Sequence, residues 1–151
     1  MTGSRLLGFS IIAVLAAGCG SSADDISEAR LAQMAGGELK DVIPVSGNVL
    51  VDGVPQGGVN IYLYASTGGK VIATCRTDVD GSYCWTTHTA CDGVEAGSYR
   101  LAFQYLPKLK RNDKGQDVFQ GRYSDPMTVE FLLNVEPGAP QADVNYELTT
   151  K

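Results

Sequence analysis

The feature that most constrains this fold is an alternation of apolar and polar residues that begins at Val45 and continues to Leu148. A period of two is typical of a β-strand with one buried face. Glycine, proline and aspartate interrupt the alternation at short intervals, as turns do. The alternating segments predict strands at 45–52, 59–65, 70–77, 82–87, 99–105, 127–135 and 142–148. Such a series of short strands predicts an all-β, seven-stranded antiparallel Greek-key sandwich.

The segment from Lys70 to Thr87 predicts a β-hairpin at the centre of the sandwich. Both arms are rich in β-branched and aromatic residues, and the sequence Asp-Val-Asp-Gly at 78–81 suits a turn. Tyr83 and Trp85 lie two positions apart, so they share one face of the strand. We expect Trp85, the only tryptophan, to be buried in the core. Its expected neighbours are Tyr99, Leu101, Phe103, Val144 and Tyr146.

Length and charge limit the number of domains and the classes of partner that this protein can have. A chain of 151 residues is normally one domain. The formal net charge of −5 argues against general nucleic-acid binding, because the phosphate backbone attracts basic surfaces. The 18 glycines are spread along the chain, which favours many turns over a low-complexity segment.

The N-terminal segment predicts a targeting signal rather than a part of the folded domain. Arg5 precedes an apolar run at 6–17 that is too short to span a bilayer as an ordinary helix. The run ends in Ala-Ala-Gly directly before Cys19, and this order is similar to a bacterial lipoprotein signal. The similarity implies that residues 1–18 are removed and that Cys19 is acylated. An ordinary secretory signal is the alternative.

Residues 19–44 predict a lipidated N-terminus and a tether, which precede a β-sandwich domain at 45–151. Good helix formers at 26–35 predict a short helix that ends at Gly36 and Gly37. The helix is either a docking element or part of a spacer, and the spacer is favoured because so short a helix is marginal alone. The acyl chains place the protein at the cell membrane or the outer membrane, on the extracytoplasmic side.

Several turn-centred motifs carry a family resemblance. They are 45–49 (VSGNV), 52–55 (DGVP), 59–61 (VNI), 77–83 (TDVDGSY), 92–101 (DGVEAGSYRL) and 122–126 (RYSDP). Together they resemble the carboxypeptidase regulatory-like domain of small bacterial lipoproteins. The resemblance implies a transthyretin-like sandwich in an extracytoplasmic setting. It implies no reaction, because a fold alone does not define one.

No set of residues predicts catalysis. Enzymes of related folds, and zinc peptidases, use at least two histidines, whereas this chain has only His88. Asp78, Asp80 and Asp92 suggest calcium, but they lack the converging ligands of a calcium loop, and turn formation explains them. We therefore expect no catalytic residue, no metal and no cofactor.

The cysteines predict one disulfide. With Cys19 lipidated, Cys75, Cys84 and Cys91 remain, and an oxidising compartment favours a bond between two of them. Cys75 faces Cys84 if the hairpin loop holds four residues, whereas a bulge at Gly81 makes Cys84 and Cys91 the better pair. We predict that Cys84 is one partner and leave the other open. A bond between Cys75 and Cys91 is the third choice.

Two surface features predict binding. Tyr62 and Tyr64 face away from the apolar side of their strand, where they either stack on a sugar or a partner, or simply cover the sheet. The long loop at 107–122 carries the basic residues Lys108, Lys110 and Arg111, together with Lys114 and Arg122. It is either a solvated loop or a contact with lipid headgroups or an envelope polymer.

The sequence thus predicts a non-enzymatic, lipid-anchored module of the cell envelope that binds or supports another component. Its expected partners are the membrane, through the N-terminal lipid, and an envelope protein or polysaccharide, but no nucleic acid. The alternative is a small carrier or sensor whose ligand occupies the mouth of the sandwich. An apolar pocket at one end of the sandwich would favour this alternative.

Overall fold

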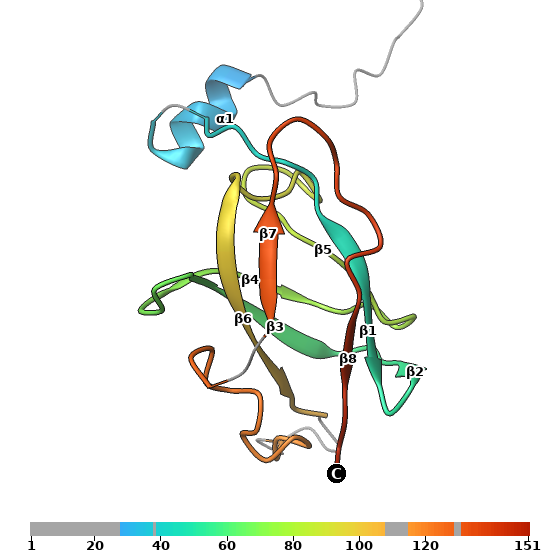
Figure 1. The fold of residues 1–151 in the computed structure, drawn as a ribbon. Coiled ribbons are helices and arrows are strands. Elements are labelled where there is room, and N and C mark those ends of the chain that lie inside the picture. The colour runs from blue at the N-terminus through green and yellow to red at the C-terminus, as the bar shows by residue number, and fades with distance from the viewer. Residues whose placement is uncertain (1–27, 38, 108–114, 129–130) are drawn as a thin grey trace, which may run out of the picture.

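Two β-sheets face each other in the computed structural model, which describes residues 28–37, 39–107, 115–128 and 131–151 (Figure 1). The elements are α1 (Glu28–Ala35), β1 (Ser46–Val51), β2 (Val54–Pro55), β3 (Val59–Ala65), β4 (Val71–Arg76), β5 (Ser82–Cys84), β6 (Gly97–Tyr105), β7 (Leu132–Val135) and β8 (Tyr146–Leu148). One sheet has the order β2-β1-β5, with β8 also paired to β1, and the other has the order β4-β3-β6-β7. The predicted all-β sandwich is confirmed.

The alternation of apolar residues decides which face of each strand is buried. Val59, Ile61 and Leu63 on β3 are fully buried, whereas the intervening Asn60 and Tyr62 are partly exposed. β1 shows the same pattern. Burial of these apolar faces between the sheets is the main favourable term for the fold.

The predicted hairpin at 70–87 is wrong in its pairing. The turn forms, because the Gly81 N–H donates to the Asp78 carbonyl at 2.9 Å and Asp78 N–H donates to the Ser82 carbonyl at 2.8 Å. Its two arms, however, belong to different sheets, since β4 pairs with β3 and β5 pairs with β1. Thr77 anchors the crossover with a buried hydroxyl that donates to the Gln56 carbonyl and accepts the Val59 N–H.

Two further strand predictions need correction. Of the described residues in the expected strand at 127–135, only β7 is a regular strand, and Met127 lies in a turn in which its N–H donates to Asp125. β8 runs parallel to β1, with Tyr146 opposite Val49, so the sandwich is not purely antiparallel. All the other strands separate β1 from β8 in the sequence, so no tight turn has to join this parallel pair. The segment between β7 and β8 carries the chain from one sheet to the other (Figure 1).

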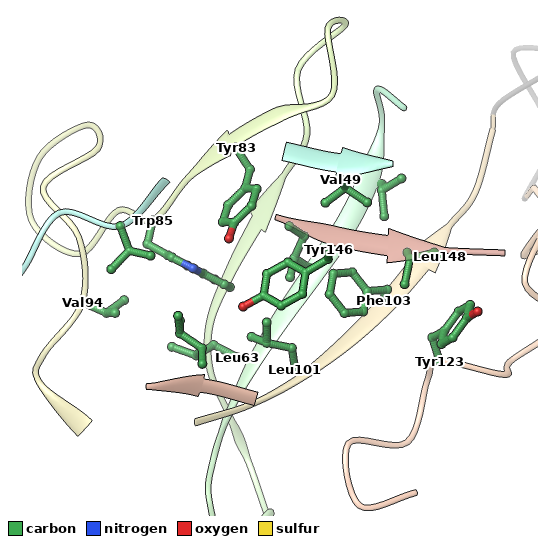
Figure 2. Close-up of a cluster of buried hydrophobic side chains, with 14 of the residues drawn as sticks. Val49, Leu63, Tyr83, Trp85, Val94, Leu101, Phe103, Tyr123, Tyr146 and Leu148 are labelled. Carbon is green, nitrogen blue, oxygen red and sulfur yellow. The ribbon is translucent and has the colours of Figure 1, made fainter. Parts of the chain in front are cut away.

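The core centres on the aromatic residues that the sequence predicted. Trp85 is completely buried and packs edge-on against Tyr83, with ring centroids 6.2 Å apart. Figure 2 shows Tyr83, Trp85, Phe103 and Tyr146 converging between the sheets. Leu101 belongs to the same buried cluster, and Tyr99 and Val144 pack against it while partly exposed. The prediction of a buried Trp85 is confirmed.

The long loop also contributes to the core, which sequence reasoning missed. Phe119 and Tyr123 are buried, and their rings meet edge to face at 5.1 Å. The Phe103 N–H donates to the Tyr123 carbonyl, and the Leu101 N–H donates to the Phe131 carbonyl. Tyr123 and Phe131 therefore extend the hydrogen bonding along the edge of β6 beyond β7, although neither residue belongs to a named strand.

The segment that leads into β1 packs on the sandwich. α1 ends as predicted at glycine, because Gly36 takes a φ of +77° and the Gly37 N–H donates to the Ala32 carbonyl. Downstream, Ile43 and Val94 exchange backbone hydrogen bonds. A Cβ on Gly93 would lie 1.8 Å from the Ile43 carbonyl oxygen, so this contact requires glycine.

Candidate functional site

The loop after β5 is held closed by a disulfide. Cys84 and Cys91 form the bond, which confirms the prediction that Cys84 is a partner, and their Cα atoms are 5.2 Å apart. Cys91 adopts a φ of +59°, and its N–H donates to the Thr86 hydroxyl. Among the described cysteines Cys75 is the free one, and burial raises the pKa of its thiol to about 12. A thiol with so high a pKa is a poor nucleophile.

Asp92 organises the same loop. Its carboxylate accepts backbone N–H groups from Thr87 at 2.7 Å, from His88 at 2.7 Å and from Thr89 at 2.9 Å. Burial alone would raise the pKa of Asp92, but these N–H donors lower it below the usual value. The disulfide and Asp92 together fix the loop, so that its threonine and histidine side chains are presented from a rigid backbone.

This loop forms one wall of a hollow of about 510 Å³, which we call the β4 groove. The opposite wall is β4 itself, and the residues that line the groove are Lys40, Ile72, Ala73, Thr74, Thr86, Thr87, His88, Val94, Glu95 and Tyr99. These residues come from four separate parts of the chain. No local sequence motif could therefore predict this groove.

Polar contacts to Lys40 join three parts of the lining of the β4 groove. Its ammonium group forms an ion pair with Glu95 at 2.5 Å, and its backbone N–H donates to Nε2 of His88 at 3.1 Å. The hydrogen bond and the charge of Glu95 raise the pKa of Lys40. His88 therefore acts here as a hydrogen-bond acceptor that holds the segment before β1.

Tyr62 and Tyr64 lie on the outer face of the second sheet, as the alternation predicted. The two rings are half-exposed and line a hollow of about 240 Å³, which we call the tyrosine hollow, together with Val71, Phe103, Gln104 and Ser124. The Tyr62 hydroxyl donates to Oε1 of Gln104 at 3.2 Å. The face thus combines aromatic rings with amide and hydroxyl groups.

A third hollow, of about 530 Å³, is mostly apolar and lies beside the segment that precedes β1. We call it the proline hollow, and its lining is Asp41, Val42, Ile43, Pro44, Ala96, Pro137, Gly138, Ala139 and Pro140. Its walls come from that segment and from the loop after β7. The Gln141 N–H donates to the Pro44 carbonyl, which holds the two walls together.

Several predicted site residues lie outside the described residues. These are Cys19, Lys108, Lys110, Arg111 and Lys114. Arg122, from the same basic set, is described, and its guanidinium donates to the Thr149 carbonyl at 3.1 Å. Arg122 therefore ties the segment after β8 to the long loop, which is a structural role.

The aspartates considered for calcium serve as backbone acceptors. Asp78 accepts the Val79 N–H, and Asp80 accepts the N–H and hydroxyl of Ser82. Among residues 28–37, 39–107, 115–128 and 131–151, no three histidine, cysteine or acidic side chains gather as metal ligands would. Within the same part of the chain, no helix is long and apolar enough to cross a bilayer.

The fold and these hollows define an all-β sandwich domain with several recessed surfaces, and comparison with known proteins adds the following. Neither a family model nor a curated protein matches the sequence. A DUF3823 family protein from Parabacteroides merdae is similar in structure, with a TM-score of 0.40 and 15% identity over 72% of this chain. An (S)-allantoin synthase is similar at a TM-score of 0.41 and 11% identity over 82% of this chain. This chain spans 46% and 47% of the two proteins.

Proposed function

We propose that this protein is a non-enzymatic, lipid-anchored module of the cell envelope that binds an envelope polysaccharide. The observation that carries the proposal is the tyrosine hollow, in which Tyr62 and Tyr64 lie beside Gln104 and Ser124. A sugar ring offers an apolar face for stacking on an aromatic side chain and hydroxyl groups around its rim. An amide and a hydroxyl at the edge of the rings are suitable partners for that rim.

The anchoring part of the proposal is supported by the sequence at 6–19 and by the disulfide. A Cys84–Cys91 bond persists in an oxidising, extracytoplasmic compartment. The same compartment is the one to which a lipoprotein signal directs a chain. The non-enzymatic part is supported by His88, the only histidine, whose Nε2 accepts the Lys40 N–H instead of facing a nucleophile.

Fractionation of membranes tests the anchor. Wild-type protein is expected in the membrane fraction, and Cys19→Ser is expected in the soluble extracytoplasmic fraction, because the acylated sulfur is lost. Cys75→Ser is the matched control and is expected to stay with the membrane. A Cys19→Ser protein that remained in the membrane fraction would disprove the lipid anchor.

Co-sedimentation with insoluble peptidoglycan sacculi tests the binding surface. We expect Tyr64→Ala to weaken binding about fivefold, because a stacked aromatic ring contributes on the order of 1 kcal/mol. Tyr64→Phe keeps the ring and is expected to bind nearly as well as the wild type. Equal binding by Tyr64→Ala and Tyr64→Phe, or no binding by the wild type, would contradict a glycan platform.

A second candidate function is that of a small-ligand carrier, and the proline hollow favours it. This hollow is larger than the tyrosine hollow, and its lining is mostly apolar. A fluorescent fatty acid is a suitable probe. Saturable binding to the wild type, lost in an Ala139→Phe variant that fills the hollow, would support a carrier. Binding that is unaffected by Ala139→Phe would reject it.

A further inference from the structure

We infer that the free edge of β4 binds an extended peptide by strand addition, and that this peptide carries acidic residues at both ends of the paired segment. The inference concerns the β4 groove and goes beyond the proposed glycan binding, on which it does not depend. Strand addition uses main-chain hydrogen bonds along an exposed sheet edge for affinity and neighbouring pockets for specificity.

The register of β4 shows which backbone groups face the free edge. β4 is the outermost strand of the sheet β4-β3-β6-β7. The Thr77 N–H donates to the Val59 carbonyl, so Thr77 and Val59 are a hydrogen-bonded pair. Such pairs alternate along an antiparallel ladder, so Cys75 opposite Ile61 is the next one. Thr74 and Arg76 therefore turn their N–H and C=O groups away from β3.

A β-bulge adds a further unpaired residue at the other end of the strand. Leu63 pairs with Ala73 and Tyr64 pairs with Val71, which leaves Ile72 without a partner on β3. This residue is 54% exposed. Outside the strand ladders, no hydrogen bond between described residues involves the backbone N–H or C=O of Ile72, Thr74 or Arg76.

The middle of this edge lacks several of the usual protections. Natural proteins protect edge strands with charges, proline, β-bulges or covering loops, and of these β4 has the bulge at Ile72 and the flanking Lys70 and Arg76. Here the residues from Val71 to Cys75 carry no charge and include no proline. The loop at 86–88 does not cover the edge but faces it across the β4 groove, with Thr86, Thr87 and His88 as the second wall. A strand laid along β4 would thus have main-chain partners on one side and a polar wall on the other.

The basic residues at the two ends of β4 favour a peptide with acidic residues. Lys70 and Arg76 flank the uncharged part of β4, both are exposed, and neither has an ion-pair partner among the described residues. Glu95, which lines the groove, is already paired with Lys40. Asp78 lies near Arg76 in a neighbouring hollow, where its Oδ1 accepts the Val79 N–H. Although the chain has a net charge of −5, this edge therefore carries a positive charge at each of its two ends.

A second copy of this chain suits the edge less well than an acidic peptide. Antiparallel pairing of two β4 edges brings two copies of Lys70 and two of Arg76 together. In the register that pairs Ile72 with Thr74, Lys70 lies directly opposite Arg76. Like charges placed opposite each other destabilise a strand pair, whereas carboxylates at both peptide ends complement them.

Titration with defined peptides tests the inference. The probes are the capped hexapeptide EVTVTE, the same peptide N-methylated at its four central amides, and KVTVTK. We expect EVTVTE to bind the wild type with backbone amide shifts at Ile72, Thr74 and Arg76 in NMR spectra. N-methylation removes the main-chain donors without changing the side chains, so it is expected to weaken binding at least tenfold.

Substitutions in the full chain provide matched controls. Thr74→Pro removes an outward N–H that β3 does not use, so the variant is expected to fold and to bind at least tenfold more weakly than Thr74→Ala. Lys70→Glu combined with Arg76→Glu is expected to reverse the preference from EVTVTE to KVTVTK. This charge swap remains informative if Thr74→Pro fails to fold.

Three results would overturn the inference. They are a failure of EVTVTE to bind at about 1 mM, equal binding of its N-methylated form, and an unchanged peptide preference after the charge reversal. Self-association of the wild type that Thr74→Pro abolishes would assign the edge to a second copy and would likewise reject the acidic peptide. Loss of glycan binding in Tyr64→Ala has no bearing on these outcomes, so the two proposals fail separately.

Discussion

Trp85 joins two properties that are seldom combined in one side chain. It is completely buried, and its indole N–H has no acceptor among the described residues. A buried donor without a partner costs free energy, so packing must outweigh this cost. The ring lies against Tyr83 and inside the cluster of buried apolar side chains between the sheets (Figure 2).

We predict that Trp85→Ala lowers the free energy of unfolding by about 3–5 kcal/mol, because it leaves a large cavity between the sheets. Trp85→Phe is expected to cost less, since phenylalanine fills part of the volume and removes the unpaired donor. Urea denaturation followed by circular dichroism measures both values. A loss below about 1 kcal/mol for Trp85→Ala would contradict a central packing role.

Asp92 predicts how stability depends on pH. Its pKa is lower in the folded protein than in the unfolded chain, so the unfolded state binds more protons as the pH falls. The stabilisation is therefore fully present above the unfolded pKa of about 3.9 and is lost as the pH drops through the folded value. Asp52 and Asp80 shift in the same direction and add to the effect.

The measurement is the thermal midpoint of unfolding between about pH 5 and pH 2.5. We expect the midpoint to fall across this range and to fall less in Asp92→Asn, which has no carboxylate to protonate. Asp41→Asn, an exposed carboxylate without a hydrogen bond among the described residues, is the control. An equal fall in Asp92→Asn and the wild type would remove Asp92 from this explanation.

At the scale of elements, the loop after β5 is stabilised twice, by the Cys84–Cys91 bond and by Asp92. The disulfide joins residues with a sequence separation of 7. For so short a loop, the chain-entropy model gives a stabilisation of about 2–3 kcal/mol. We predict that Cys84→Ser combined with Cys91→Ser lowers the free energy of unfolding by this amount and leaves the domain folded.

Denaturation in urea, with and without reductant, tests this prediction. Reductant is expected to destabilise the wild type and to leave the double variant unchanged. Cys75→Ala provides the control, because Cys75 is free and its loss should not alter the response to reductant. Unfolding of the double variant in the absence of urea would show that the disulfide decides folding rather than supporting one loop.

The elements also show what a sequence can and cannot predict. β1 and β3 were predictable because the alternation of apolar and polar residues indicates which side chains face inward. The pairing of β4 was not, because the turn at 78–81 fixes a reversal of direction but not the sheet to which each arm belongs. Phe119 and Tyr123 escaped prediction for another reason. They enter the core from irregular backbone, which has no period to recognise.

At the scale of the whole molecule, the tyrosine hollow and the β4 groove also differ in whether the sequence could predict them. Tyr62 and Tyr64 were predictable as outward residues, since they belong to one strand. The β4 groove was not, because Lys40, Thr74 and His88 meet only after both sheets and the segment before β1 have packed. A site that the tertiary fold assembles from distant segments leaves no local signature in the chain.

The pairing of β8 with β1 has a consequence for how the chain is made. Asn48 donates its N–H to Asn145, 97 positions later, and Val49 lies beside Tyr146 in the same pair of strands. A growing chain therefore carries β1 with one edge open until almost all of the domain is available, and contacts so distant in sequence form slowly. The sandwich therefore forms completely only after β8 has been synthesised, and it cannot be built up strand by strand from β1. A product truncated before Tyr146 would leave that edge of β1 unpaired and would uncover the core rings of Tyr83 and Phe103, against which Tyr146 packs. Quality-control proteases should therefore remove it rather than let it persist as a partial domain.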